Sequence, residues 1–243
     1  MHLPWSLARD AGNDGGEMIR FALFMTIAAS TWAADPIFFN GKDLSGWHAP
    51  RGPSYWSVED GAIVGRSGIK VPKNQFIWSR VPVADFYLSV DVKITPDRRN
   101  AGIQFRSLPR KNGEANGYQA DVGTGKWGRL FHEGGRGKLD WRARGEAAAK
   151  PKGWNRYEIL AVGDRVWLAV NGKLGASIRD PKGERTGFIG FQLHAGLAQT
   201  VQYGNLKLVH NPKTITLAGL DETAVNDELI APQEEDAKPP ITK

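Results

Sequence analysis

The chain has 243 residues, a formal net charge of +6 and no cysteine. Its length suits one full-sized β domain or two small ones, and the missing cysteine excludes disulfides, thiolate zinc sites, cysteine nucleophiles and a lipoprotein anchor. Because the basic residues are interspersed with acidic ones and form no uninterrupted Lys/Arg block, the charge does not indicate a nucleic-acid partner.

Residues 1–34 predict an N-terminal extension followed by a signal peptide. Met18 and Arg20 open a short basic segment, residues 21–29 are apolar, and small residues precede a cleavage point near Ala34. The apolar run is too short for a stable membrane span. Residues 1–17 are polar, so translation is expected to start at Met18. We expect an exported protein, periplasmic or extracellular; a short buried helix is the alternative.

Residues 35–211 predict a single β domain. Alternating apolar and polar residues indicate strands at 86–94, 155–162, 165–170, 174–178, 187–194 and 201–209, and around Ile103, Ala120 and Leu130. Asp60-Gly61 and Asn171-Gly172 predict tight hairpins, since both central positions of a type I′ turn need positive φ. Long helices are not indicated, so the fold class is all-β, an antiparallel two-sheet sandwich.

Residues 212–243 differ in character from the β domain. Their end is acidic, contains proline and is poor in aromatic residues. This composition predicts a flexible C-terminal tail, with one short helix near residues 217–229.

Three of the predicted strands carry hydrogen-bonding side chains on the face opposite their apolar residues. These side chains are Gln104 and Arg106, Gln119 and Asp121, and Gln192 and His194. Sugar hydroxyls require mixed donors and acceptors, which amide, carboxylate, guanidinium and imidazole groups supply. The pattern therefore predicts a surface that binds or cleaves carbohydrate.

Asp121 is the strongest single candidate for a catalytic residue. Its strand neighbours are apolar, and a sheltered carboxylate can have a raised pKa and act as a general acid or base. The alternative is a cross-strand ion pair with Arg106 or Arg129. His194 can donate to a sugar oxygen, transfer a proton or bind a metal, or it can be merely structural.

Glu133 ends a predicted strand and precedes the glycine-rich residues 134–137, where Arg136 could anchor an oxygen-rich substrate. An ordinary surface loop is the alternative. Asp121 and Glu133 could form the acid/base pair of a retaining or inverting glycosidase. No cofactor is expected; a divalent metal held by His194, Asp121 and Glu133 is the lesser alternative, because no close-spaced ligand motif supports it.

The tryptophans divide by context. Pyranose CH faces stack on indole rings, and three tryptophans in loop-like segments are expected to serve in this way: Trp47, Trp127 and Trp141. Three in strand-like segments are expected to pack in the core or on the second face: Trp56, Trp154 and Trp167. The chain has no phosphate loop, dinucleotide fingerprint, Gly-x-Ser-x-Gly elbow or His-Glu-x-x-His motif, which disfavours nucleotide chemistry and serine hydrolysis.

In series, several motifs resemble the 3-keto-disaccharide hydrolase domain family of bacterial exported proteins. They are 39–47 (FNGKDLSGW), 56–65 (WSVEDGAIVG), 101–106 (AGIQFR), 117–121 (GYQAD), 154–159 (WNRYEI), Asn171-Gly172 and 190–194 (GFQLH). The resemblance covers residues 37–209 and implies a concanavalin A-like lectin/glucanase sandwich (a jelly roll). Many members carry Glu at the position of Gln119 and Gln at that of Asp121, so this chain departs from the common pattern there.

The resemblance implies chemistry on glycosides oxidised at C3. A base removes the C2 proton, the glycosidic oxygen leaves C1, and water addition gives net hydrolysis. Asp121 or Glu133 would be the base, with His194 and Arg106 holding the enolate. Gln104, Gln119 and Gln192 would bind hydroxyls. The alternatives are a non-catalytic, lectin-like carbohydrate-binding module and a structural or adhesive β domain. The expected partner is an oligosaccharide or glycoside.

Overall fold

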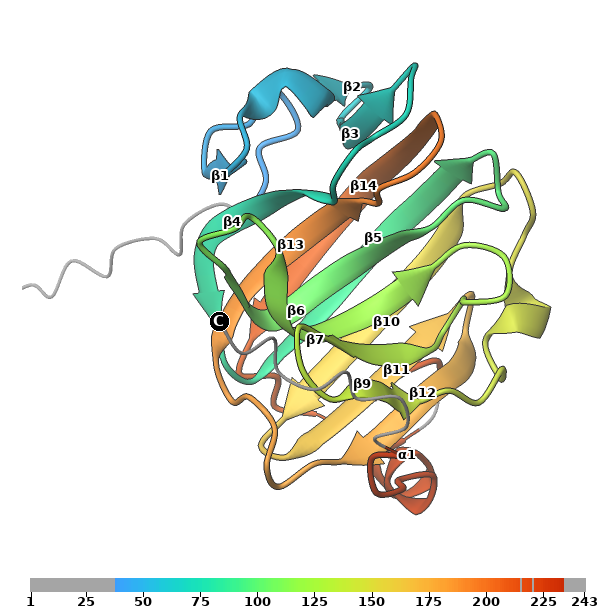
Figure 1. Ribbon diagram of the computed structural model, residues 1–243. Coiled ribbons are helices and arrows are strands. Elements are labelled where there is room, and N and C mark those ends of the chain that lie inside the picture. The colour runs from blue at the N-terminus through green and yellow to red at the C-terminus, as the bar shows by residue number, and fades with distance from the viewer. Residues whose placement is uncertain (1–37, 215, 220, 234–243) are drawn as a thin grey trace, which may run out of the picture. The chain divides into compact units, whose positions relative to one another are not determined.

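Two antiparallel sheets of seven strands each form a sandwich in the computed structural model (Figure 1). Sheet A has the order β1 (Trp47–His48), β4 (Gln75–Val83), β13 (Gly187–Leu193), β6 (Ala101–Pro109), β7 (Ala115–Val122), β8 (Leu130–Glu133), β9 (Gly137–Asp140). Sheet B has the order β12 (Lys173–Arg179), β11 (Arg165–Val170), β10 (Asn155–Val162), β5 (Phe86–Thr95), β14 (Gln199–His210), β3 (Ala62–Ser67), β2 (Trp56–Glu59). Short 3₁₀ turns occupy Pro53–Tyr55 and Glu146–Ala148, and helix α1 spans Glu222–Asp227.

The structure describes residues 38–214, 216–219 and 221–233. The predicted extension and signal peptide lie outside the described residues. Within them, the predicted all-β sandwich is confirmed, and no helix of the described part combines the length and apolar character that a bilayer crossing requires. Three strands were not predicted from the sequence: β1, β4 and β9.

Both predicted hairpin turns are confirmed. Asp60 and Gly61 join β2 to β3 with φ of 49° and 74°. Asn171 and Gly172 join β11 to β12 with φ of 49° and 76°. Positive φ at both central residues gives the backbone twist that flanking antiparallel strands need, so these two dipeptides fix the local register.

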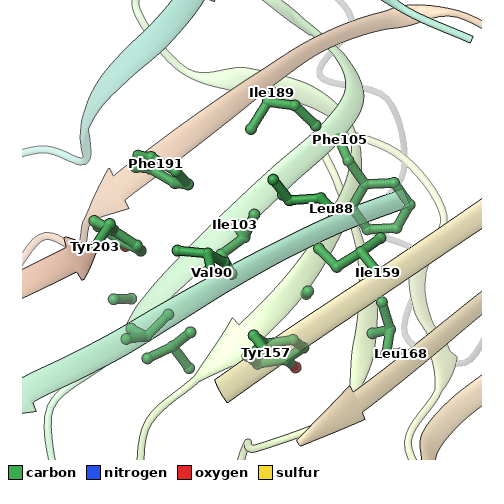
Figure 2. Packing of buried hydrophobic residues seen from close by; sticks show 14 of the residues in the cluster. Leu88, Val90, Ile103, Phe105, Tyr157, Ile159, Leu168, Ile189, Phe191 and Tyr203 are labelled. Carbon is green, nitrogen blue, oxygen red and sulfur yellow. The ribbon is translucent and has the colours of Figure 1, made fainter. Parts of the chain in front are cut away.

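The core lies between the two sheets. Leu88 and Val90 of β5 pack among Ile103 and Phe105 of β6, as Figure 2 shows. Every second residue of these strands is buried in this layer, which follows from the period-2 alternation of a strand. The other face of each sheet is therefore available for side chains with other roles.

The segment after β14 is packed against sheet B rather than loose. Leu217 and Val225 are buried against Leu160 and Trp167 on the face of sheet B that points away from the core. The Trp167 indole donates a hydrogen bond of 2.8 Å to the carbonyl of Val225. The sequence predicts a flexible tail here, whereas the described residues from 212 to 233 pack on sheet B through the apolar side chains of Leu217 and Val225. The expected short helix is present as α1.

Candidate functional site

The outer face of sheet A, meaning the face that points away from sheet B, carries polar side chains on its central strands. The strand register aligns them in two cross-strand rows: Gln192, Gly102 and Asp121, then Gly190, Gln104 and Gln119. The register thus brings together amide and carboxylate groups from β6, β7 and the sequence-distant strand β13 on one face, as the sequence predicted.

Two glycines leave room for large side chains to lie flat across this face. A Cβ atom added at Gly102 would lie 2.6 Å from Cδ of Gln119. A Cβ atom added at Gly190 would lie 2.6 Å from Cε3 of Trp78. The Gln119 amide and the Trp78 indole therefore lie over the backbone of these glycines, and any side chain at either glycine would displace them. Trp78 was not assigned a role from sequence.

A directional chain of hydrogen bonds ends on the Asp121 carboxylate. Nε2 of Gln104 donates to Oε1 of Gln119 at 2.6 Å, and Nε2 of Gln119 donates to Oδ1 of Asp121 at 2.6 Å. Asp121 is only 4% exposed. Its other oxygen, Oδ2, accepts no hydrogen bond from a described residue. The two glutamines therefore orient the carboxylate and leave one oxygen available for a ligand.

Burial raises the pKa of Asp121 to about 7, and the negative charge of Glu133 acts in the same direction. The hydrogen bond from Gln119 and the charges of Lys126 and Arg129 oppose this rise. A carboxyl group with a pKa near 7 is suited to accept a proton at neutral pH. The structure shows no ion pair between Asp121 and Arg129 in the described part of the chain, so the alternative interpretation of Asp121 is not realised there.

Several polar atoms on the face that carries Asp121 are buried without a hydrogen-bond partner. Both amide atoms of Gln192, Oε1 of Gln104 and Nε1 of Trp78 are in this state. Gln192 and Gln104 are fully buried and Trp78 is 3% exposed. Because nearly all buried polar groups in proteins are paired, these unpaired atoms on one face are groups that a ligand or ordered water would satisfy.

Glu133 and His194 lie at opposite ends of this face. Glu133 pairs with Gly117, four residues before Asp121 on β7, so the two acidic residues are separated by about 13 Å along the strand. They interact through charge and do not form a close carboxylate pair. His194 comes two residues after Gln192, near the Asp121 end, and its Nδ1 donates 2.6 Å to the Ala195 carbonyl. This bond leaves Nε2 as the nitrogen that can face a ligand.

Arg106 does not lie beside Asp121. A bulge between Phe105 and Leu108 gives Arg106 a φ of 45°, which breaks the alternation that the sequence analysis assumed. Its guanidinium donates to the carbonyls of Ala84 and Gly163 at 2.8 Å each and to Asp85 at 2.9 Å. The predicted meeting of Arg106 with Asp121 and His194 on one surface therefore does not occur.

Arg136 also lies apart from Asp121. It donates to Asp180 at 2.6 Å, and its guanidinium carbon lies 5.8 Å from the centroid of the Tyr118 ring. Tyr118 itself belongs to the core and donates to the same carboxylate at 2.5 Å. Arg136 therefore completes a buried polar network with Asp180 and Tyr118.

Of the three tryptophans expected to stack on sugar, one lies at the edge of the polar face. Trp47 and Trp127 are core residues, 5% and 4% exposed. Trp141 is partly exposed and contacts Phe131 edge-on with ring centroids 6.0 Å apart. The Arg129 guanidinium carbon lies 5.1 Å from the centre of its ring. Phe131 was not among the aromatic residues expected from the sequence at this face. It pairs with Gln119 across the strands.

No group of three or more His, Asp or Glu side chains is arranged to hold a metal ion in the described part of the chain. His194, Asp121 and Glu133, the trio considered from sequence, span the length of the face.

Comparisons with known proteins agree with this architecture. Residues 35–209 match the 3-keto-alpha-glucoside-1,2-lyase-like domain. A candidate glycosyl hydrolase structure from Parabacteroides distasonis shares 21% identity with a TM-score of 0.55, covering 73% of this chain and 94% of that one. Carbohydrate binding module CBM66 from Bacillus subtilis shares 20% identity with a TM-score of 0.50, covering 71% and 99%. Among curated protein sequences, no significant match is found.

These two structures share the fold with this chain, and the domain match spans most of the sandwich. The chain therefore belongs to the 3-keto-alpha-glucoside-1,2-lyase-like domain family, as the order of its sequence motifs predicted.

Proposed function

We propose that this protein cleaves glycosides whose sugar is oxidised at C3, with Asp121 as the base. The observation that carries the proposal is a sheltered carboxylate with a pKa of about 7, held by Gln119 beside unpaired buried amide atoms. The family to which the chain belongs supports the same substrate class. The substrate would lie across the outer face of sheet A.

The reaction begins with proton abstraction. The 3-keto group acidifies the C2 hydrogen, and Asp121 takes that proton, so the electrons of the C2–H bond form an enolate with negative charge on O3. When the enolate collapses, the C1–O bond breaks and the glycosidic oxygen takes a proton. The products are an unsaturated 3-keto sugar and the free alcohol. Water adding across C1 and C2 then completes a net hydrolysis.

Gln192 is suited to bind the enolate. Its amide is fully buried, carries two unpaired atoms and shares a row with Asp121. A preorganised donor in a site sheltered from water stabilises developing charge without reorganisation. The oxyanion role that the sequence analysis gave to Arg106 thus passes to Gln192. His194, whose Nδ1 is held by the Ala195 carbonyl, presents Nε2 and would pass a proton to the leaving oxygen.

The test compares the full chain with its Asp121→Asn variant on a 3-keto-disaccharide. Loss of the general base should lower kcat/KM by roughly 10²–10⁴-fold, while circular dichroism stays native-like and the melting temperature does not fall. Deuterium at C2 of the substrate should slow turnover by the wild-type protein, because the reaction breaks the C2–H bond. Turnover that is equal in the variant would overturn the role of Asp121. Tight binding without any product would identify a carbohydrate-binding module instead.

Export is part of the proposal and is supported by the pattern that runs from Met18 to Ala34. Expression of the full chain with N-terminal sequencing of the extracytoplasmic protein tests it. A mature end near Ala34 is expected, whereas an unprocessed cytoplasmic protein would contradict export.

A further inference from the structure

A hollow lies on the face of sheet B that points away from the core, on the opposite side of the sandwich from Asp121. It has a volume of about 580 Å³, and its lining includes Trp154, Lys93, Gln202, Gly204 and Asn205. Strand pairing places Gln202 opposite Lys93 and Gly204 opposite Asp91. These residues are separated from Asp121 by the thickness of the sandwich, so the hollow is not part of the site on sheet A.

Trp154 supplies an exposed aromatic surface at this hollow. It directly precedes β10 and is 41% exposed, although its strand-like context predicted packing. A Cβ atom added at Gly204 would lie 3.6 Å from two atoms of its ring, so the indole lies over the glycine backbone. A large ring fixed against a flat floor offers a stacking platform at low entropic cost.

The polar groups of the hollow are held in place before any ligand arrives. Arg156 donates to Asp91 at 2.5 and 3.0 Å, and Asn205 donates to Asp91 at 2.6 Å. Asn205 has a φ of 49° within a bulge of β14 between Gly204 and Lys207, and bulges often aim side chains at functional sites. Because Nδ2 of Asn205 is bound to Asp91, its Oδ1 is the atom left to accept a hydrogen bond.

Two further side chains in the hollow have hydrogen-bonding capacity to spare. The Gln202 amide and the Lys93 ammonium make no hydrogen bond to any described residue. Together with Oδ1 of Asn205, they present both donors and acceptors within reach of the Trp154 ring. This combination of a stacking surface and mixed polar groups is the same chemistry that sugar hydroxyls and CH faces require.

The charges around the hollow cancel. Glu59 is bonded to Arg66 at 2.8 and 2.7 Å, and Asp91 to Arg156. The hydrogen bond from Arg156 lowers the pKa of Asp91, so this carboxyl group stays ionised and paired. A neutral rim does not favour phosphates or other anions, and a paired carboxylate of low pKa is not a proton-transfer group.

We propose that this hollow is a second, non-catalytic binding site for a neutral saccharide. One sugar ring would stack on Trp154 while Gln202, Asn205 and Lys93 bind its hydroxyls. The protein would then hold a glycan on sheet B independently of the reaction on sheet A. The binding needs no turnover, so its test does not depend on whether the cleavage proposal is correct.

The test uses native affinity electrophoresis of the full chain in the Asp121→Asn background, in gels containing dextran, pullulan, laminarin or xylan. At least one of these neutral polysaccharides should retard the protein. Trp154→Ala should weaken the retardation roughly tenfold or more, because aromatic anchors carry most of the energy in such sites. Trp154→Phe should retain part of it. Gly204→Leu, which retains the Trp154 residue but puts a side chain where its ring packs, should also abolish it.

Two controls separate binding from folding and from the other face. Melting curves of each variant verify that the sandwich is intact, and Trp141→Ala tests sheet A. Absence of retardation by all four polysaccharides would overturn the proposal, as would retardation that depends on Trp141 and not on Trp154. Binding of a single-stranded oligonucleotide that is lost in Trp154→Ala would also overturn it, since it would identify a different class of ligand.

Discussion

Gln119 donates a 2.6 Å hydrogen bond to Asp121, and this bond opposes the effect of burial on the carboxyl pKa. Without it, the carboxyl group would hold its proton to still higher pH. Gln119 receives its own hydrogen bond from Gln104. The register of β6 and β7 therefore sets the orientation of both hydrogen bonds.

The pH dependence of turnover should report this bond. If Asp121 is the base, kcat/KM should rise as pH increases through about 7 and level off above it. Gln119→Met removes a donor to the ionised form, so the acidic limb should move up by about one pH unit or more. Rate profiles from pH 5 to 9 measure the acidic limb of the wild type and of Gln119→Met. An acidic limb at the same pH in both proteins would show that Gln119 does not act on Asp121.

Ionisation of Asp121 should also lower the free energy of unfolding. Its folded pKa, about 7, lies above the ordinary value of 3.8, so between these pH values the folded state keeps a proton that the unfolded chain releases. The contribution of this proton to the free energy of unfolding is fully present below about pH 4 and is lost as the pH rises through about 7. The total loss is about 4 kcal/mol.

Asp121→Asn removes this penalty, because asparagine stays neutral and its Oδ1 can still accept from Gln119. The variant should therefore be more stable than the wild type at pH 8 by about 2–4 kcal/mol, with a difference that shrinks toward pH 4. Urea unfolding at several pH values measures this difference. A variant that is less stable at pH 8 would indicate that the ionised carboxylate is stabilised in the fold.

Gly102→Ala should disturb the carboxylate without touching the core. The added methyl would lie 2.6 Å from Cδ of Gln119, and the flexible amide must move away from Asp121. The acidic limb of the rate profile should therefore shift upward, as in Gln119→Met. Gly68→Ala is the matched control, since a Cβ atom there meets nothing within 4 Å and should change neither rate nor pH profile.

The sequence predicted the sandwich because strand alternation and hairpin dipeptides are local signals. Asp60-Gly61 and Asn171-Gly172 determine turn geometry on their own, and the alternation through Gln104, Gln119 and Gln192 determines a face. The strand β4 was missed because buried polar and aromatic residues interrupt its apolar pattern. Trp78 therefore had no assigned role until its pairing with β13 was known.

The site was only partly predictable because side-chain direction depends on defects in the sheet and on long-range packing. In the sequence, Arg106 follows the same alternation as Gln104. Only the bulge turns its side chain away from the face that carries Gln104. Trp47 lies in a turn-rich segment, yet it stacks on Phe191 with ring centroids 5.0 Å apart. Conversely, Trp154 is exposed because its partner at Gly204 has no side chain to cover it.

Arg106 should be structural. It is fully buried, and its guanidinium donates to three backbone carbonyls and to Asp85. Arg106→Met leaves those acceptors unpaired, so the free energy of unfolding should fall by about 3 kcal/mol or more. The kcat of the folded variant should stay unchanged at low temperature. Lost turnover with wild-type stability would restore the catalytic role that the sequence suggested.

The segment from residue 212 to 233 should stabilise the sandwich through Leu217. This side chain is 1% exposed and packs with Leu160 and Trp167 on sheet B. Leu217→Ala should lower the free energy of unfolding by about 2–4 kcal/mol, because it leaves a cavity between the segment and the sheet. Thr216→Ala, at an exposed neighbouring position, should be neutral. Urea unfolding of both variants provides the measurement. Equal stability of Leu217→Ala and wild type would mean that the segment detaches at little cost, as a flexible tail would.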